Sequence, residues 1–520
     1  MDANSKPNVL CFILDQLRHD HLGCAGNKQV QTPHIDDIAR KGVMFRRAYV
    51  ANPLCMPARA TLFTGQPPRV HGVRTNGIPL SYEVPTLPEA LRRAGYRTHS
   101  VGKLHLRTFQ MQENLPEAVK TPELFPESSD TWYSGALNKL PSPYYGLQSA
   151  DFINGHTSYV YGEYDTWLRK EHPNAKIMLT QNAPLSKPTG APQCFKMSIP
   201  EAWHYNRWIA DKAIDFLNAQ ADSGDPFFLW CSFPDPHHPY AAPQPWCDMY
   251  NPDEMELPRA RREGEFGDLP HFYNDIREVG GTFAGGQSGP AKTCDAHLRE
   301  MIALTYGMIS FVDQEIGRIM ACLRAQDKEK DTVIVFLSDH GDMMGDHWMV
   351  RKGPFSHDGQ MKMPFIWSWP GHLCEQAVTD SLVGQIDFVP TLLDLCGVAM
   401  DDGGLLPTPE AEQQLPHLPG RSLVPLLTGR AEKVNDCVII ENDEDYLGLR
   451  IRTFVGERYK MTVYAGKSYG ELYDLETDPD ELFNLWDDEK YAAVKQAVKA
   501  SFLDAYITQD SALPRRICHV

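Results

Sequence analysis

The sequence predicts an α/β fold: a large mixed, mostly parallel sheet covered by helices on both faces, followed by a smaller C-terminal α+β subdomain with a short antiparallel sheet. Two observations predict the main sheet. Short, continuous apolar runs alternate with amphipathic segments of helical length, as they do in sheets buried on both faces. The runs are also rich in β-branched and aromatic residues. Near the C-terminus the order changes to short strands followed by one helix, which predicts the subdomain.

The individual elements follow from apolar spacing and from helix-ending glycines. A helix over residues 35–41 ends at Gly42 and another over 86–94 ends at Gly95, since glycine readily adopts the left-handed conformation that terminates helices. Further helices are predicted over residues 296–325, 388–395 and 489–507. Strands are predicted over residues 9–14, up to 101, and over 227–233, 333–337, 365–369, 438–441 and 459–463.

Two stretches interrupt the alternation of strands and helices. Residues 109–200 are rich in Pro, Tyr, Trp and His without a clear period, and residues 252–292 are rich in Gly and charge. We interpret both as insertions, because long irregular segments inside a domain are usually functional or disordered. The expected organisation is a main domain over residues 1–420, with 401–419 as a connector, and a subdomain over 421–520.

Composition narrows the classes of partner. The chain has 520 residues, 42% of them apolar, and a formal net charge of -18. Such an acidic protein is not expected to bind nucleic acid or an anionic membrane surface. The N-terminus lacks a basic, apolar leader, and no apolar run approaches the roughly 20 residues of a membrane span. We therefore expect a cytoplasmic protein without a membrane partner.

The most informative stretch is the run from Cys55 to Gly65. A cysteine, a proline two residues later and an arginine two residues after that form the signal for oxidising the cysteine to formylglycine. Here these are Cys55, Pro57 and Arg59, and Thr64-Gly65 follows them. The aldehyde, rather than the encoded thiol, would then be the working group at position 55.

Acidic residues follow two of the predicted buried strands. Asp15-Gln16 comes after the strand at 9–14, and Asp339-His340 after the strand at 333–337. Ligands of such sheets collect beyond the carboxyl ends of the strands. A carboxylate next to a second donor is suited to a divalent cation. Each aspartate could equally cap the next helix, but the pairs together with the cysteine motif favour a metal site.

Cationic residues and histidines also follow predicted strands. Lys103 and His105 lie two residues apart after the strand that ends at 101, and would face one pocket on extended chain. Such a pair could hold an anion and move a proton, although alone it would more often be a surface feature. His237 and His238 lie between two prolines that stiffen their loop.

A last group of residues follows Asp339-His340. Lys352 could reach back into the same pocket, whereas its neighbour Arg351 is expected to be solvated. Asp346, His347 and His357 are ambiguous, and we assign them no role in the site.

These motifs, in this order, resemble the formylglycine-dependent sulfatases of the alkaline phosphatase superfamily, including arylsulfatases and phosphonate monoester hydrolases. The resemblance begins at 8–15, includes Thr32–Asp36, and ends in the run 471–479. It implies an alkaline phosphatase-like fold, one divalent cation (Ca²⁺ or Mn²⁺), a small-molecule sulfate ester substrate, and maturation by a formylglycine-generating enzyme. Homo-oligomeric assembly stays open.

The resemblance also implies a role for each matching residue. The implied metal ligands are Asp15, Gln16, Asp339, His340 and one oxygen of the formylglycine made from Cys55. Arg59 holds the formylglycine, Lys103 bridges it and the substrate anion, His105 is a base, His237 and Lys352 face the leaving-group oxygen, and Asn76 contacts the anion.

These roles describe one reaction. A hydroxyl of the hydrated aldehyde attacks sulfur, which gives a covalent sulfo-enzyme hemiacetal. Lys103, Lys352 and the cation offset the charge on the transferring oxygens, and His237 or Lys352 protonates the departing alcohol. His105 then deprotonates the second hydroxyl, sulfate leaves, and the aldehyde is restored.

Departures from the family pattern leave an alternative. Many members have Asp-Asp and Asp-Asn where this chain has Asp15-Gln16 and Asp339-His340, and the added imidazole shifts the preference from Ca²⁺ toward Mn²⁺. That ligand set resembles phosphonate monoester hydrolases, which lack the pair formed here by Lys103 and His105. We predict a sulfatase, with phosphonate monoester or phosphodiester hydrolysis as the alternative. The complete set of catalytic residue types disfavours a non-catalytic binding protein.

Overall fold

The computed structural model describes residues 6–111, 115–116, 119–183, 186–279, 294–398, 418–445 and 447–509. Most of the predicted connector over 401–419, and residues 280–292 of the second predicted insertion, lie outside the described residues.

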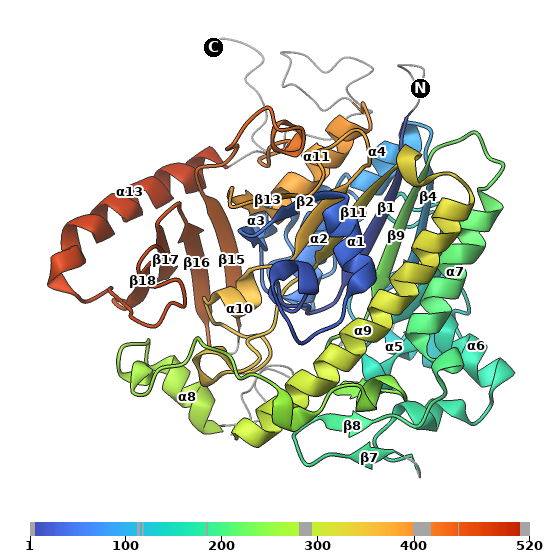
Figure 1. Ribbon diagram of the computed structural model, residues 1–520, viewed down its shortest axis with the longest axis horizontal. Coiled ribbons are helices and arrows are strands. Elements are labelled where there is room, and N and C mark those ends of the chain that lie inside the picture. The colour runs from blue at the N-terminus through green and yellow to red at the C-terminus, as the bar shows by residue number, and fades with distance from the viewer. Residues whose placement is uncertain are drawn as a thin grey trace.

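A nine-stranded sheet forms the centre of the molecule, in the order β13-β2-β12-β11-β1-β9-β4-β5-β6 (Figure 1). The five neighbours β11, β1, β9, β4 and β5 are all parallel, whereas β12 and β6 run antiparallel to the strands beside them. The bounds are β1 Asn8–Leu14, β2 Gly42–Phe45, β4 Arg97–Gly102, β5 Ser149–Asn154, β6 Tyr161–Gly162, β9 Phe227–Phe233, β11 Thr332–Ser338, β12 Phe365–Ser368 and β13 Ala377–Thr379.

Helices cover both faces of this sheet, and the side chains of β1 show why. Successive residues of a strand point to opposite faces. Leu10, Phe12 and Leu14 belong to one core with α1, α7 and α9, while Val9, Cys11 and Ile13 belong to the other with α2, α4 and α11. Both sets are fully buried. The predicted sheet with helices on both faces is therefore confirmed.

The helices that build these two layers differ in length. The longest, α9, runs alongside α7 and α1 (Figure 1). Their bounds are α1 Pro33–Arg40, α2 Cys55–Thr64, α4 Leu87–Arg93, α7 Tyr205–Ala219, α9 Asp295–Ala325 and α11 Phe388–Leu395. Shorter helices are α3 Pro68–His71, α5 Ser129–Tyr133, α6 Glu163–Glu171, α8 Phe272–Val279, α10 Asp358–Met361 and α12 Val424–Leu427.

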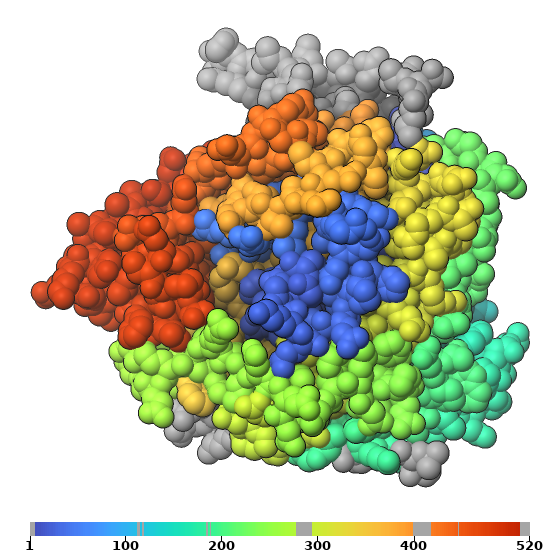
Figure 2. All heavy atoms as spheres, in the orientation of Figure 1, coloured from blue at the N-terminus to red at the C-terminus, as the bar shows by residue number. Residues whose placement is uncertain are grey.

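The C-terminal part is a four-stranded antiparallel sheet with one helix packed on it. Its elements are β15 Val438–Glu444, β16 Leu449–Val455, β17 Tyr459–Tyr464, β18 Gly470–Asp474 and α13 Ala492–Thr508. α13 buries Val498 and Phe502 against this sheet. In the space-filling view the C-terminal part borders the light-green segment around residues 250–279 (Figure 2), and Asn484 donates to the Asp268 carbonyl there.

The described residues also form two smaller sheets. β7 Lys187–Pro188, β8 Cys194–Lys196 and β10 Tyr240–Ala242 form one of them. β3 Ala48–Tyr49 and β14 Val383–Gly384 form another. Within the part of the chain that the structure describes, no helix has both the length and the apolar character needed to cross a bilayer.

One stretch differs from its sequence interpretation. Residues 109–200 were expected to form an irregular insertion, but they contribute β5 and β6 to the central sheet and α6 to its surroundings. The strand β5 contains serine, aspartate and asparagine and lies next to the edge strand, so it lacks the continuous apolar run of a central strand. This strand carries a residue of the site described next.

Candidate active site

The five parallel strands each deliver one residue of the site just past their carboxyl ends. Because parallel strands end at the same edge, these side chains converge there. They are Asp15 after β1, Lys103 after β4, His156 after β5, His237 after β9 and Asp339 after β11. All five are buried, with His156 the most exposed at 7%. The edge of the sheet, rather than any single loop, therefore sets their spacing.

Cys55 is the first residue of α2, a helix whose residues are all buried. Pro57 fits within its first turn, where backbone N–H groups have no intrahelical partner. Asn76 Oδ1 accepts the Met56 N–H at 3.0 Å, so this half-buried asparagine caps the helix next to Cys55. The helix N-terminus thus points Cys55 at the strand ends, where its dipole favours negative charge.

The sulfur of Cys55 is surrounded by charged groups. Its Sγ lies 2.8 Å from Lys352 Nζ, 3.1 Å from His340 Nε2 and 3.7 Å from Asp15 Oδ1. Burial raises the pKa of this thiol, but the positive charges of Lys352, His340 and Lys103 outweigh burial and hold it well below the usual value. The site is therefore built to stabilise an anion at position 55.

Arg59 lies one helical turn after Cys55 and connects both acidic strand ends. Its Nε donates to Asp339 Oδ2 at 2.8 Å. Its Nη1 donates to Ser232 Oγ at 3.0 Å and to the Lys103 carbonyl at 2.9 Å. Nη2 lies 3.6 Å from Asp15 Oδ2 and has no hydrogen-bond partner among the described residues. That unused donor is available to a group at position 55.

Lys103 lies between a carboxylate and an imidazole. Its ammonium donates to Asp15 Oδ2 and contacts His156 Nε2 at 2.6 Å. Since an ammonium has no acceptor, His156 accepts this hydrogen bond through Nε2. Sequence reasoning missed His156. The sequence carries no strong signal for it, because the strand before it, β5, lacks a continuous apolar run.

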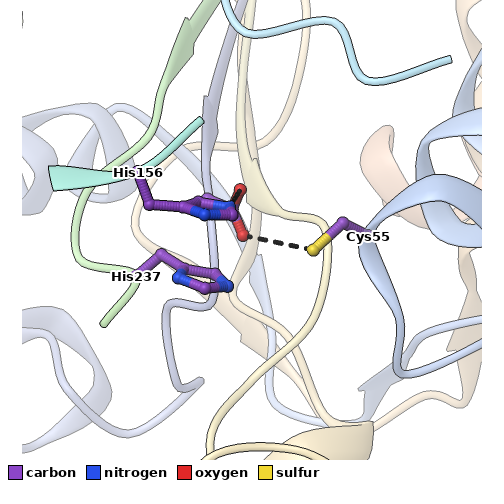
Figure 3. A group of neighbouring side chains, drawn as sticks. Cys55, His156 and His237 are labelled. Atoms are coloured by element: carbon purple, nitrogen blue, oxygen red, sulfur yellow. Dashed lines mark hydrogen bonds and ion pairs between the residues drawn. The ribbon is translucent and has the colours of Figure 1, made fainter. Parts of the chain in front are cut away.

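His237 faces the same space from the opposite loop. Its ring stacks on that of His156 with centroids 3.5 Å apart, and both rings lie opposite the sulfur of Cys55 (Figure 3). His237 Nδ1 donates to the His238 carbonyl at 2.6 Å, so Nε2 is free to accept from Lys352 Nζ at 3.1 Å. Burial, His156 and Lys352 lower the pKa of His237 well below its usual value. His238 stacks on His237, with ring centroids 4.2 Å apart, and its Nδ1 contacts Gln16 Nε2 at 3.1 Å.

His105 approaches residue 55 from the loop after β4. Burial and the nearby Lys103 charge lower the pKa of His105 to about 3, and a hydrogen bond to Cys55 opposes that shift. Its ring stacks on Phe109 with centroids 3.7 Å apart. At neutral pH this imidazole is unprotonated and able to accept a proton.

A set of donors suited to a divalent cation lies around Cys55. Asp15, Cys55, Asp339 and His340 each offer one ligand atom within 4.8 Å of the others. His340 Nδ1 donates to the Gly341 carbonyl at 2.8 Å, which directs Nε2 into the set. Gln16 is held by its amide nitrogen, 2.6 Å from Asp342 Oδ2, while its buried Oε1 has no partner among the described residues. These donors fit a hard or borderline cation.

The expected exposure of Arg351 is wrong. The side chain is only 2% exposed. The loop folds back on itself here: Met343 N–H donates to the Arg351 carbonyl at 2.7 Å, and Arg351 N–H donates to Asp342 Oδ1 at 2.6 Å. This fold presents the adjacent Lys352 to Cys55.

The fold and this cluster define a class of protein. A mixed sheet with parallel central strands, whose carboxyl edge brings two buried carboxylates together with a cysteine on a helix N-terminus, is similar to that of hydrolases in the alkaline phosphatase superfamily.

Comparison with known proteins identifies the family. The sulfatase family matches residues 7–398, and the C-terminal part of N-sulphoglucosamine sulphohydrolase matches residues 345–507. An arylsulfatase of Clostridium perfringens is 29% identical, covering 94% of this chain and 91% of that protein. A choline-sulfatase of Rhizobium meliloti is 26% identical over 96% and 86%. The phosphonate monoester hydrolase of Agrobacterium radiobacter has 30% identity and a TM-score of 0.78, covering 97% and 96%. The chain belongs to the sulfatase family and is a sulfuric ester hydrolase.

Proposed function

We propose that this protein hydrolyses sulfate monoesters with a formylglycine made from Cys55, assisted by one divalent cation. The observation that carries the proposal is the position of Cys55. It begins a buried helix inside a C-x-P-x-R motif, and both lysines and both acidic strand ends of the site lie around it. An aldehyde hydrate at this position supplies one hydroxyl that attacks sulfur and a second whose deprotonation expels sulfate.

The cationic residues around position 55 lie on two sides of it, and we assign them different roles in binding the substrate sulfate. Arg59 and Lys103 hold negative charge on the nucleophile side, because their cationic groups already contact Asp15 and Asp339. Lys352 lies on the other side, between Cys55 and His237. A substrate sulfate placed between Lys103 and Lys352 has cationic donors on two sides, which offsets the charge that develops on its oxygens. Asn76 fixes the helix start that carries the nucleophile.

Two proton transfers can be assigned. The leaving alcohol needs a proton, and Lys352 holds one: burial lowers its pKa, but Cys55, Asp15 and Asp339 outweigh burial and raise it. His237 Nε2 accepts a hydrogen bond from Lys352 and so orients it or relays its proton. On the opposite side, neutral His105 is the base for the second hydroxyl.

A divalent cation fits the donors named above. Asp15, Gln16, Asp339, His340 and residue 55 would hold it, and the orphaned Gln16 Oε1 is an oxygen suited to that purpose. When bound, the cation would lower the pKa of a hydroxyl at residue 55 and offset charge on sulfate oxygens. The imidazole of His340 favours Mn²⁺ over Ca²⁺.

A mass spectrum of the peptide containing residue 55 tests the nucleophile. Formylglycine is about 18 Da lighter than cysteine, and we expect the lighter peptide in active preparations. Cys55→Ala should abolish hydrolysis of aryl sulfates, whereas Cys24→Ala, at a half-buried cysteine outside the site, should not. Unchanged activity in Cys55→Ala would refute the proposed nucleophile.

Phosphonate monoester or phosphodiester hydrolysis is the second candidate. The pairs Asp15-Gln16 and Asp339-His340, together with the structural similarity to a phosphonate monoester hydrolase, favour it. The pair Lys103 and His105, both within the site, favours sulfate esters. Rates on 4-nitrophenyl sulfate and 4-nitrophenyl phenylphosphonate, measured on one preparation, decide between them. A higher kcat/KM for the phosphonate would reverse our order.

A further inference from the structure

A second cluster of potential metal ligands lies outside the active site. His347, His357 and Glu481 are all buried, and each offers one ligand atom within 4.8 Å of the other two. His347 belongs to the short helical turn Asp346–Trp348, and His357 directly precedes α10. Glu481 follows β18 in the C-terminal part. We propose that this cluster binds a structural divalent cation of the zinc type.

Glu481 Oε2 accepts hydrogen bonds from the Asp358 N–H at 3.0 Å and from His357 Nδ1, and the second spacing is also that of two ligands around one ion. His357 Nδ1 lies 3.3 Å from Glu481 Oε2. Tetrahedral zinc with bonds of about 2.0–2.1 Å places neighbouring ligands roughly 3.3 Å apart. The rings of His347 and His357 are stacked, with centroids 3.5 Å apart and planes 17° from parallel. One ring must therefore tilt for both nitrogens to aim at one ion.

Each ligand already has the outer partner that a metal ligand needs. Metal-bound histidines commonly donate their second N–H to a carboxylate or another acceptor. His347 Nδ1 lies 3.5 Å from Glu265 Oε2, which leaves Nε2 for the ion. His357 Nε2 lies 3.4 Å from the Tyr273 hydroxyl and 3.9 Å from Glu471 Oε2.

Glu265 pairs with His347 through one carboxylate oxygen, Oε2, and its other oxygen supplies a second observation. The residue is 2% exposed, and its Oε1 has no hydrogen-bond partner among the described residues. A buried carboxylate is costly unless it is paired or near a metal. The buried Lys460 contacts Asp358 Oδ1 and Glu481 Oε1. A cation between His347 and His357 would compensate Glu265 and leave Glu481 Oε2 as its carboxylate ligand.

An ion has a route to this cluster. A cavity of about 470 Å³ is lined by His347 and Glu481, together with Asp346, Asp358 and Asp480. The lining also includes the cationic side chains of Arg18, Lys28, Arg259 and Lys362, so the cavity offers a path to the cluster rather than a uniformly acidic funnel.

The position of the cluster indicates what the ion would do. It joins three segments that are distant in sequence: the segment of Glu265, the loop between β11 and β12, and the chain after β18. Lys352 lies midway between His347 and His357 in that loop. A cation bound there would fix both ends of the loop that presents Lys352 to Cys55.

Zinc stoichiometry in a chain with a disabled active site tests the proposal. Full-length Asp15→Asn/Asp339→Asn protein is loaded with ZnCl₂, dialysed, and analysed by mass spectrometry of its metal content. We expect one zinc per chain, and an absorption spectrum of tetrahedral Co²⁺ when cobalt replaces zinc. Both signals should disappear when His357→Gln is added. Cys55, His340, His156 and His237 remain in this chain and could also hold zinc. Only the zinc that is lost when His357→Gln is added therefore counts toward the proposal, which makes the result independent of the proposed function.

Additional variants keep the test decisive. Glu481→Gln, which preserves volume, replaces His357→Gln if that variant does not fold by circular dichroism. Glu265→Gln should weaken zinc binding by about 10- to 100-fold, the usual effect of losing an outer partner. His372→Gln, at an exposed histidine, is the matched control and should retain the zinc. A folded Asp15→Asn/Asp339→Asn chain without zinc would overturn the proposal.

Discussion

His156 offers the sharpest test of the site, because two of its interactions can be removed separately. Its Nε2 accepts a hydrogen bond from Lys103 Nζ at 2.6 Å, and its ring stacks on His237 at 3.5 Å. His156→Phe keeps an aromatic ring for the stack but removes the acceptor. His156→Gln keeps an acceptor but removes the stack.

The expected magnitudes follow from the two interactions. A hydrogen bond to a charged group contributes about 1.5–3 kcal/mol, so losing it in His156→Phe should lower kcat/KM roughly 10- to 150-fold. A ring pair contributes about 0.5–1.5 kcal/mol, so His156→Gln should lose roughly 2- to 10-fold. The difference arises because Lys103 without its acceptor is oriented by Asp15 alone.

The assay is hydrolysis of 4-nitrophenyl sulfate at neutral pH, with the extent of modification at residue 55 measured in each variant. Equal modification ensures that the rates report on the site rather than on maturation. The assigned role of His156 is refuted if His156→Phe retains wild-type kcat/KM, or if His156→Gln falls as far as His156→Phe.

Three further predictions concern stability and metal content. Burial lowers the pKa of His71 from 6.5 to about 3, so the unfolded chain binds more protons between these values and stability falls as pH drops through that window. His71→Gln should flatten the dependence of the unfolding free energy on pH by up to about 1.4 kcal/mol per pH unit, and an unchanged slope in denaturant titrations would contradict this. Gly102→Ala should destabilise far more than Gly95→Ala: both have positive φ, but only the Gly102 Cβ would meet a carbonyl oxygen, Ser232 O at 1.9 Å. Equal melting temperatures would refute the clash. Chelation should lower activity and melting temperature, Mn²⁺ should restore both, and Asp339→Asn should not respond to Mn²⁺.

The positions of the acidic strand ends could be predicted because the strands before them are continuous apolar runs. β1 and β11 are buried along their length and read as unbroken apolar runs, so Asp15 and Asp339 mark obvious carboxyl ends. Parallel pairing then brings them together without further information. The strands β9 and β12 were located for the same reason.

His156 and Arg351 could not be predicted because their environments are made by tertiary contacts. β5, which precedes His156, has a polar sequence and sits in a stretch rich in proline and tyrosine. Arg351 has the sequence context of a solvated residue, yet backbone hydrogen bonds to Asp342 and Met343 bury it. The helix α2 also shows no amphipathic period, since every residue in it is buried.

The complete burial of α2 has a consequence for how the protein is made. Cys55 is 1% exposed and its helix is enclosed on all sides. An enzyme that converts Cys55 must bind the surrounding peptide, and it can do so only before the sheet and α2 assemble. If the proposed conversion of Cys55 takes place, it must therefore compete in time with folding. Slower synthesis, or more maturation enzyme, should raise the active fraction, whereas chains that fold first remain unconverted.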